Sequence, residues 1–141
     1  MTMIRKDLHN NITQKNALHT RAITTSTTTT GVIIDLKGFG ACEFVFQMGD
    51  WTDGVYTPVI TEGDASDLSG GTTVTDANNL FGTLAAVATA LNADDTTARV
   101  GYRVGAHRYV RLDIVSSGVT SGTAALGVTA ILSNADNMPT A

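Results

Sequence analysis

The stretch CEFVFQM, residues 42–48, determines how the rest of the chain is interpreted. Every second side chain from Cys42 to Met48 is apolar, whereas Glu43 and Gln47 lie between them. A period of two residues is typical of a β-strand that buries one face and exposes the other. We therefore expect a half-buried strand here, with Cys42 packed as a small core residue.

Turn signals and further apolar runs on both sides of this strand predict an all-β fold. The segment DWTDG, residues 50–54, contains an Asp-Gly pair that suits a tight hairpin turn. Pro58 lacks an N–H, so its strand should lie at an edge or a bulge. Further strands are expected at residues 32–36, 55–61, 99–104, 108–115 and 124–132. We predict an antiparallel β-sandwich or jelly-roll-like barrel with one short helix and an extended N-terminal arm.

Two local elements are predicted in more detail. Apolar residues at helical spacing from Leu80 to Leu91 predict the helix, with Asn78 or Asn79 capping its start and Asn92 its end. The last long strands are expected to form a hairpin across residues 105–107. Its inward side chains would be Val100, Tyr102, Val104, Val110, Leu112 and Ile114.

The charge is divided unevenly along the chain. Of the 141 residues 16% are charged and the net charge is −4, yet residues 1–30 carry +3 and residues 31–141 carry −7. We therefore expect a basic arm at 1–30 and a β-sandwich body at 31–141. The arm has few apolar side chains, so it would be extended or disordered in isolation. Its threonine-rich stretch, residues 24–30, could add a strand to a neighbour's sheet.

Composition also excludes several classes of protein. An acidic balance argues against a nucleic-acid partner, and the absence of a long apolar run argues against a membrane span or signal peptide. One cysteine, Cys42, excludes an intramolecular disulfide framework and suggests synthesis in a reducing compartment. Three scattered histidines cannot join it in a zinc cluster of standard spacing.

No motif supports catalysis, so we expect neither an enzyme nor a cofactor. The segment GVTSG, residues 118–122, places its serine one position too late for a nucleophile elbow. The loop at 62–79 offers Glu62, Asp64 and Asp67 as oxygen ligands for calcium, but their spacing does not match the twelve-residue calcium loop. A solvated loop is the preferred interpretation, and no metal site is predicted.

Two groups of residues are candidates for partner contacts in the body. The first comprises four arginines on the predicted hairpin: Arg99, Arg103, Arg108 and Arg111. They could dock an acidic partner surface, or form a solvated strand face with Asp113 compensating locally. The second is Trp51, which is either a lid on the sandwich end or an anchor in a partner's pocket. In the arm, the candidate contacts are Ile4, Arg5, Lys6, Leu8, Ile12 and Arg21.

Several short motifs together carry a family resemblance. They are MIRKDLHNNI at 3–12, EFVF at 43–46, TPV at 57–59, EGD at 62–64, VGY at 100–102, RYVR at 108–111 and GVTA at 127–130. In this order and spacing the chain resembles a family of small tailed-bacteriophage head proteins. The resemblance implies a virion structural protein, made in the host bacterial cytoplasm and located on the capsid surface. Among virion proteins, the resemblance favours the role of a capsid decoration (cement) protein or minor head protein.

The resemblance also implies partners, and it leaves alternatives open. The partners would be the major capsid protein and further copies of the chain itself, as a homo-oligomer, most simply a trimer. One alternative is a head-tail connector, completion or spike protein. Another is a glycan-binding module in which Trp51 and the polar loops at 62–79 and 116–123 form a sugar site.

Overall fold

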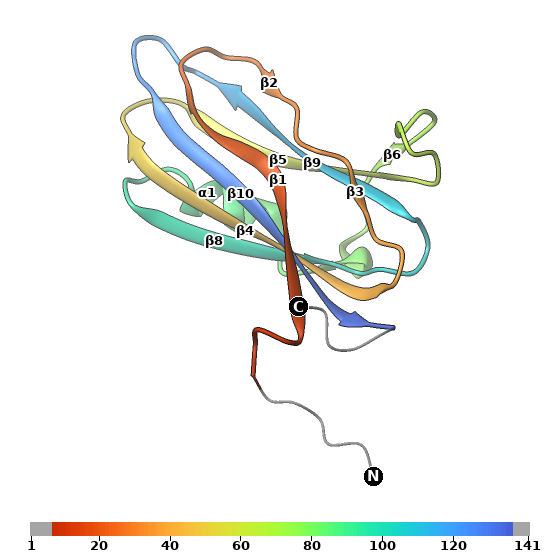
Figure 1. The fold of residues 1–141 in the computed structure, drawn as a ribbon. Coiled ribbons are helices and arrows are strands. Elements are labelled where there is room, and N and C mark those ends of the chain that lie inside the picture. Colours follow the sequence, from red (N-terminus) through yellow and green to blue (C-terminus); the bar gives the residue numbers. More distant parts are fainter. Residues whose placement is uncertain (1–6, 137–141) are drawn as a thin grey trace.

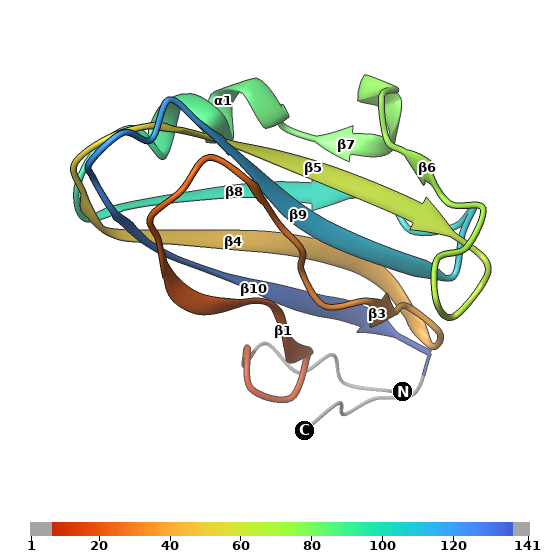
Figure 2. The same cartoon turned by 90° about the horizontal axis from the view of Figure 1, so that it is seen from above.

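The computed structural model describes residues 7–136, which form two antiparallel sheets packed face to face (Figures 1 and 2). Sheet A contains, in spatial order, β1 (Ile12–Ile23), β10 (Ala124–Ala135), β4 (Phe39–Trp51), β8 (Thr96–Tyr102) and β7 (Leu80–Phe81). Sheet B contains β2 (Thr28–Thr29), β9 (Tyr109–Ser117), β5 (Val55–Gly63) and β6 (Thr72–Thr73), with β3 (Ile34–Asp35) also pairing to β9. The all-β sandwich predicted from the sequence is confirmed.

The core lies between the two sheets and is built from the alternate residues of each long strand. Phe44 and Phe46 in β4 are fully buried, and Cys42 and Met48 are nearly so, as the two-residue period predicted. From sheet B, the inward side chains include Tyr56 and Ile60, also fully buried. Burial of this apolar surface is the main force that holds the sheets together.

The two strands expected to form the second hairpin lie in different sheets. β8 pairs with β4 and β7 in sheet A, whereas β9 pairs with β5 in sheet B. Residues 103–108 therefore cross from one sheet to the other, and the predicted hairpin is wrong. The inward faces were nevertheless correct for Val100, Tyr102 and Leu112, because both sheets bury their side chains in the same core.

One side of the sandwich is closed by the helix. The helix α1 (Leu84–Ala90) packs against β5 and β8 and buries Val87 against the core (Figure 2). It is shorter than predicted, and its N-cap is Thr83, whose hydroxyl accepts a 3.1 Å hydrogen bond from Ala86 N. Its C-terminal cap is Leu91, so the predicted asparagine caps at both ends are wrong.

Two further details of this side follow from local geometry. Asn78 and Asn79 belong to a short 3₁₀ turn, η1 (Ala77–Asn79), capped by Asp76. β5 meets β6 only at Thr61 and Glu62, so Pro58 faces no strand on the side away from β9. The predicted edge position of Pro58 is confirmed locally, because an edge is where a missing N–H costs least.

The other side of the sandwich is closed by the N-terminal region, which differs from the expected arm. β1 pairs along β10 and buries Ala17, Leu18 and Ile23, while β2 pairs with β9. The predicted boundary at residue 30 is therefore absent from the fold, because the inward apolar side chains of β1 pack into the core. Within the threonine-rich stretch, Thr28 and Thr29 pair with β9 of the same chain.

The segment that follows β2 is held by hydrogen bonds from two of its backbone N–H groups. Gly31 N donates to Oδ1 of Asp113 at 2.9 Å, and Val32 N donates to the carbonyl of Ala17 at 2.8 Å. Asp113 was expected to point into solvent, but it is only 6% exposed because this segment and Arg111 cover it. A buried carboxylate thus anchors the N-terminal region to β9.

Candidate functional site

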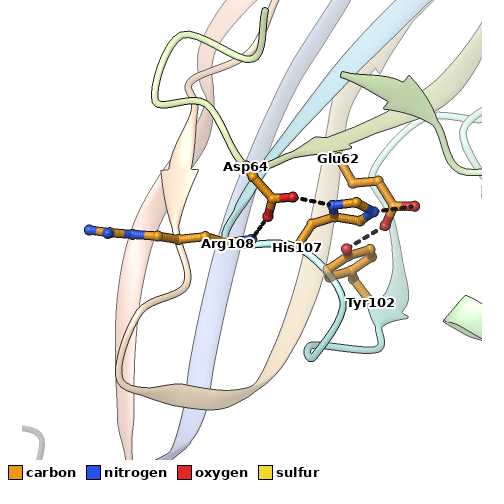
Figure 3. Close-up of polar contacts among 5 residues, drawn as sticks. All are labelled: Glu62, Asp64, Tyr102, His107 and Arg108. Carbon is orange, nitrogen blue, oxygen red and sulfur yellow. Dashed lines mark hydrogen bonds and ion pairs between the residues drawn. The ribbon is translucent and has the colours of Figure 1, made fainter. Parts of the chain in front are cut away.

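A polar cluster at one end of the sandwich joins the two sheets (Figure 3). The hydroxyl of Tyr102, in β8 of sheet A, donates a 2.5 Å hydrogen bond to Oε2 of Glu62, in β5 of sheet B. The ring of His107 lies between Glu62 and Asp64, with Nε2 3.8 Å from Oε1 of Glu62 and Nδ1 3.2 Å from Oδ2 of Asp64. Arg108 N donates to Oδ1 of Asp64 at 3.3 Å. The crossing segment 103–108 is thereby fastened to the end of β5.

The environment of this cluster determines its chemistry. Tyr102 is 1% exposed and Glu62 8% exposed, so both polar groups depend on each other for a hydrogen bond. Burial, and then the hydrogen bond to Glu62, raise the pKa of Tyr102 well above its ordinary value. The phenol therefore stays protonated and acts as a donor, not as a base.

The same geometry argues against a metal centre at this cluster. The two ring nitrogens of His107 face different carboxylates, so the imidazole separates Glu62 from Asp64. Ligands of one metal ion must instead converge on a common point. Within residues 7–136 no group of three or more His, Cys, Asp or Glu side chains is arranged to hold a metal ion.

The acidic residues of the predicted loop at 62–79 serve separate local roles. Asp67 accepts a 2.9 Å hydrogen bond from Ser69 N, and Asp76 accepts one of 2.8 Å from Asn78 N. Asp64 is engaged by His107 and Arg108. Asp67 and Asp76 therefore each stabilise their own turn, whereas Asp64 holds the segment between β8 and β9.

The structure does not bring the four candidate arginines together on one face. Arg99 lies in sheet A, where its Nε is 4.0 Å from Oε1 of Glu43, whereas Arg111 lies in sheet B and forms two hydrogen bonds with Asp113. The guanidinium of Arg103 lies over the ring of Phe81, 4.5 Å from its centroid. Each of these three arginines contacts another side chain of the same protein, and the three do not share one surface. Their role in binding a partner protein stays a prediction.

Arg108, the fourth arginine, precedes β9 and links it to β3. Its Nε and Nη2 donate to the two carboxylate oxygens of Asp35 at 2.9 and 2.8 Å. These hydrogen bonds, supported by the Lys37 backbone N–H, lower the pKa of Asp35 to about 2. Since Asp35 is in β3, this pair ties the N-terminal region to β9 at a second point.

Trp51 has the environment of a lid. It ends β4, packs against the core and donates a 3.1 Å hydrogen bond from its indole N–H to the carbonyl of Gly54. The neighbouring loop, residues 116–123, lies at the same end, since Thr52 N donates to the carbonyl of Thr123. The loop at 62–79 follows the opposite end of β5. Trp51 and both polar loops therefore cannot form one sugar site.

The candidate contacts in the N-terminal region fall into two groups. Ile4, Arg5 and Lys6 lie outside the described residues. Leu8 is 69% exposed, close to a turn in which Asp7 accepts a 2.9 Å hydrogen bond from Asn10 N. Ile12 and Arg21 lie in β1, half-buried and exposed respectively. The structure therefore places Leu8 and Arg21 where a partner can reach them.

The outer face of sheet A carries a shallow groove that the sequence did not indicate. It has a volume of about 320 Å³ and runs over β1, β10 and β4. Its lining is uncharged and includes Asn16, Thr20, Val45, Gln47, Ala125 and Thr129. Thr20 lies close to Gly127: a Cβ added at Gly127 would be 2.3 Å from the hydroxyl oxygen of Thr20. Close approach of β1 to this glycine is what shapes the groove.

Sequence reasoning missed the pairing of Glu62 with Tyr102, although one signal was available. Tyr56, Pro58 and Ile60 are the inward residues of β5, and Glu62 continues their alternation. A carboxylate at an inward strand position requires a buried partner. The identity of that partner depends on which strand lies opposite, which a sequence pattern does not specify.

The chain matches no protein-family model and no curated protein. Among solved structures it is similar to the crystal structure of SPBc2 prophage-derived protein YomS, with a TM-score of 0.43 and 12% sequence identity. That alignment covers 86% of this chain and 92% of the other. Among the described residues there is no helix long and apolar enough to cross a membrane.

Proposed function

We propose that this chain is a structural protein of a tailed-bacteriophage particle, and specifically a capsid decoration (cement) protein that binds the outer surface of the assembled head. The short motifs from MIRKDLHNNI at 3–12 to GVTA at 127–130 support a head protein by resemblance. The single structural observation that carries the proposal is the uncharged groove on the outer face of sheet A. This groove runs over β1, β10 and β4, and the side chains that line it are uncharged.

This surface has the character of a protein interface. The centres of protein interfaces are depleted of charged residues, and the groove on sheet A has none in its lining. On a capsid such a contact is repeated at every lattice position, so that copies joined to one another gain from multivalency.

The residues before β1 offer an additional contact. Leu8 is the most exposed of the large apolar side chains in the described part of the chain, and an ordered turn holds it at the surface. An apolar side chain held in this way can enter a pocket on the partner with little loss of conformational entropy. We infer that residues 1–11 act as a latch on the capsid, while β1 belongs to the body.

Binding to undecorated heads tests the proposal. Heads assembled without this chain are mixed with the full chain, and occupancy is measured by cryo-electron microscopy. We expect many copies distributed over the head lattice, whereas a connector would form a single ring of about a dozen copies at one vertex. Absence of binding to the head surface would refute the decoration role.

Two variants separate the latch from the body in the same assay. Removing residues 1–11 leaves β1 intact, since this strand begins at Ile12. We expect that removal to lower occupancy, and full occupancy would exclude the latch. Replacing Val45 by arginine places a charge in the groove, and Val59→Arg on the outer face of sheet B is the matched control. Equal binding by both would exclude the groove as the contact.

A further inference from the structure

Two groups of charged side chains, one basic and one acidic, form no ion pair within residues 7–136. On β1, Lys15 and Arg21 are exposed, and neither forms an ion pair within residues 7–136. Arg99, Arg108 and Arg111, in contrast, are each paired with a carboxylate. The basic charge that remains available in the described N-terminal region is therefore concentrated on one edge strand.

The acidic charge gathers at the end of the sandwich where β4 finishes. Three segments meet there: the β4–β5 turn, the loop before β8 and the loop between β9 and β10. Their contacts are Asp94 Oδ1 accepting from Trp51 N at 2.6 Å, Asp95 N donating to the carbonyl of Gly49 at 3.0 Å, and Asp53 Oδ2 accepting from Thr120 N at 2.7 Å. This acidic end comprises Asp50, Asp53, Asp94 and Asp95.

The three segments that form the acidic end supply no positive charge of their own. Residues 49–55, 91–96 and 118–123 contain no lysine, arginine or histidine. None of the four aspartates forms an ion pair with the described part of the chain. Four uncompensated charges at one end create a negative potential that attracts a basic surface.

We propose that the basic strand β1 of one copy binds the acidic end of a second copy, so that the chains join head to tail. The two surfaces carry opposite charge, and the half-buried Trp51 gives the acidic end an apolar centre. A contact between two different patches of the same chain is heterologous, and it closes into a ring where the rotation permits. This inference deepens the proposed function, because it supplies the contact between copies on the head.

An ionic-strength series on the isolated full chain gives the first test. We expect the chain to sediment as an oligomer at about 0.05 M salt and to dissociate at about 0.5 M, where exposed charges are screened over a few ångströms. A wild-type chain that sediments as a monomer at both salt concentrations would overturn the proposal. Because no capsid is present, this result is independent of the head-binding assay, and either proposal can fail alone.

Two variants test the contact itself. Lys15→Glu with Arg21→Glu reverses the basic strand, whereas Asp50→Lys with Asp95→Asn weakens the acidic end. Asparagine is chosen at 95 because the backbone there has φ of 53°, which asparagine tolerates. Each variant alone should self-associate at least about tenfold more weakly than the wild type.

Mixing the two variants distinguishes a head-to-tail contact from a symmetric one. The first variant keeps its acidic end and the second keeps its basic strand, so one contact can still form between them. We expect the mixture to give a dimer although each variant alone is a monomer. A mixture that stays monomeric would contradict the head-to-tail arrangement.

A matched control separates the position of the charge from its amount. Asp136→Lys with Asp67→Asn changes the net charge by the same amount as the acidic-end variant, but at the opposite end of the sandwich, where β10 finishes and β5 leads into its loop. We expect this control to associate like the wild type. If it dissociates as the acidic-end variant does, net charge is the cause and the proposed contact is wrong.

Discussion

Tyr102 and Glu62 come from opposite sheets and form a 2.5 Å hydrogen bond inside the sandwich. Forty residues separate them in the sequence. The phenol supplies the donor that the Glu62 carboxylate needs at a depth where water has little access. The pair therefore fixes how one sheet lies against the other at this end, next to the crossing segment that carries His107.

Replacing Tyr102 by phenylalanine should destabilise the fold while leaving the packing of its ring intact. The loss leaves Glu62 with an unsatisfied buried oxygen, which costs about 1–3 kcal/mol in the free energy of unfolding. Urea denaturation followed by circular dichroism measures the change. Tyr109→Phe is the control, since Tyr109 lies half-buried and forms no side-chain hydrogen bond among those described; its effect should stay within about 0.5 kcal/mol. Equal stability of both variants would contradict the role of the pair.

Gly31→Ala should be among the most destabilising single changes in the chain. An added Cβ would lie 2.0 Å from the carbonyl oxygen of Leu112 and 2.5 Å from that of Ala17, both of them backbone atoms. The backbone at Gly31 would have to move away from β9 and give up its hydrogen bond to Asp113. We expect a loss of more than about 3 kcal/mol in the free energy of unfolding.

Gly49→Ala provides the matched control for this prediction. It also lies next to another strand, but its added Cβ would meet its nearest atom, Cβ of Ala125, at an ordinary 3.5 Å. Its unfolding midpoint in urea should remain close to that of the wild type. Should both glycine variants lose stability equally, close approach at Gly31 is not what holds the N-terminal region in place.

The elements predicted well from sequence are those with unbroken alternation. β4 keeps a two-residue period over its central part, so its inward residues were identified directly. β1 was not identified, because register shifts between Asn16 and Leu18 and between Leu18 and Arg21 interrupt its period. Bulges of this kind also twist an edge strand and discourage uncontrolled pairing, as does the exposed Lys15.

The error at β8 and β9 has a different cause. A hairpin within one sheet and a crossing between two sheets give the same inward pattern, since both place alternate residues in the core. The six residues between Tyr102 and Tyr109 permit either path. The positions of the outward side chains do depend on the path, because the crossing places Arg99 and Arg111 on different sheets. The predicted group of arginines depended on the two strands pairing in one sheet, and it was lost when that pairing proved wrong.

The ion pair between Asp35 and Arg108 predicts a specific loss of stability in acid. Its hydrogen bonds lower the pKa of Asp35 from 3.8 to about 2, so the folded state holds the carboxylate charged at lower pH than the unfolded chain does. The stabilisation is thus present above pH 3.8 and is lost as the pH falls toward about 2. Because both side chains are almost half exposed, solvent screening limits the effect to about 0.5 kcal/mol.

Asp35→Asn measures this contribution. The variant should be slightly less stable than the wild type near neutral pH, and the difference should disappear as the pH falls toward about 2. Urea denaturation at a series of pH values gives both curves. A difference that stays constant over the whole series would mean that the ion pair does not titrate with Asp35.

The thiol of Cys42 should react only when the fold opens. Cys42 is 4% exposed on the inward face of β4, and burial, with a smaller effect of Glu43, raises its pKa to about 12. Thiolate is the reactive form, and at about pH 8 the folded chain holds almost none of it. Modification by a disulfide reagent should therefore be slow in buffer and rapid in urea, and Tyr102→Phe should accelerate it by raising the open population. Rapid modification of the wild-type chain in buffer alone would show that β4 opens without global unfolding, contrary to the central position of this strand between β10 and β8.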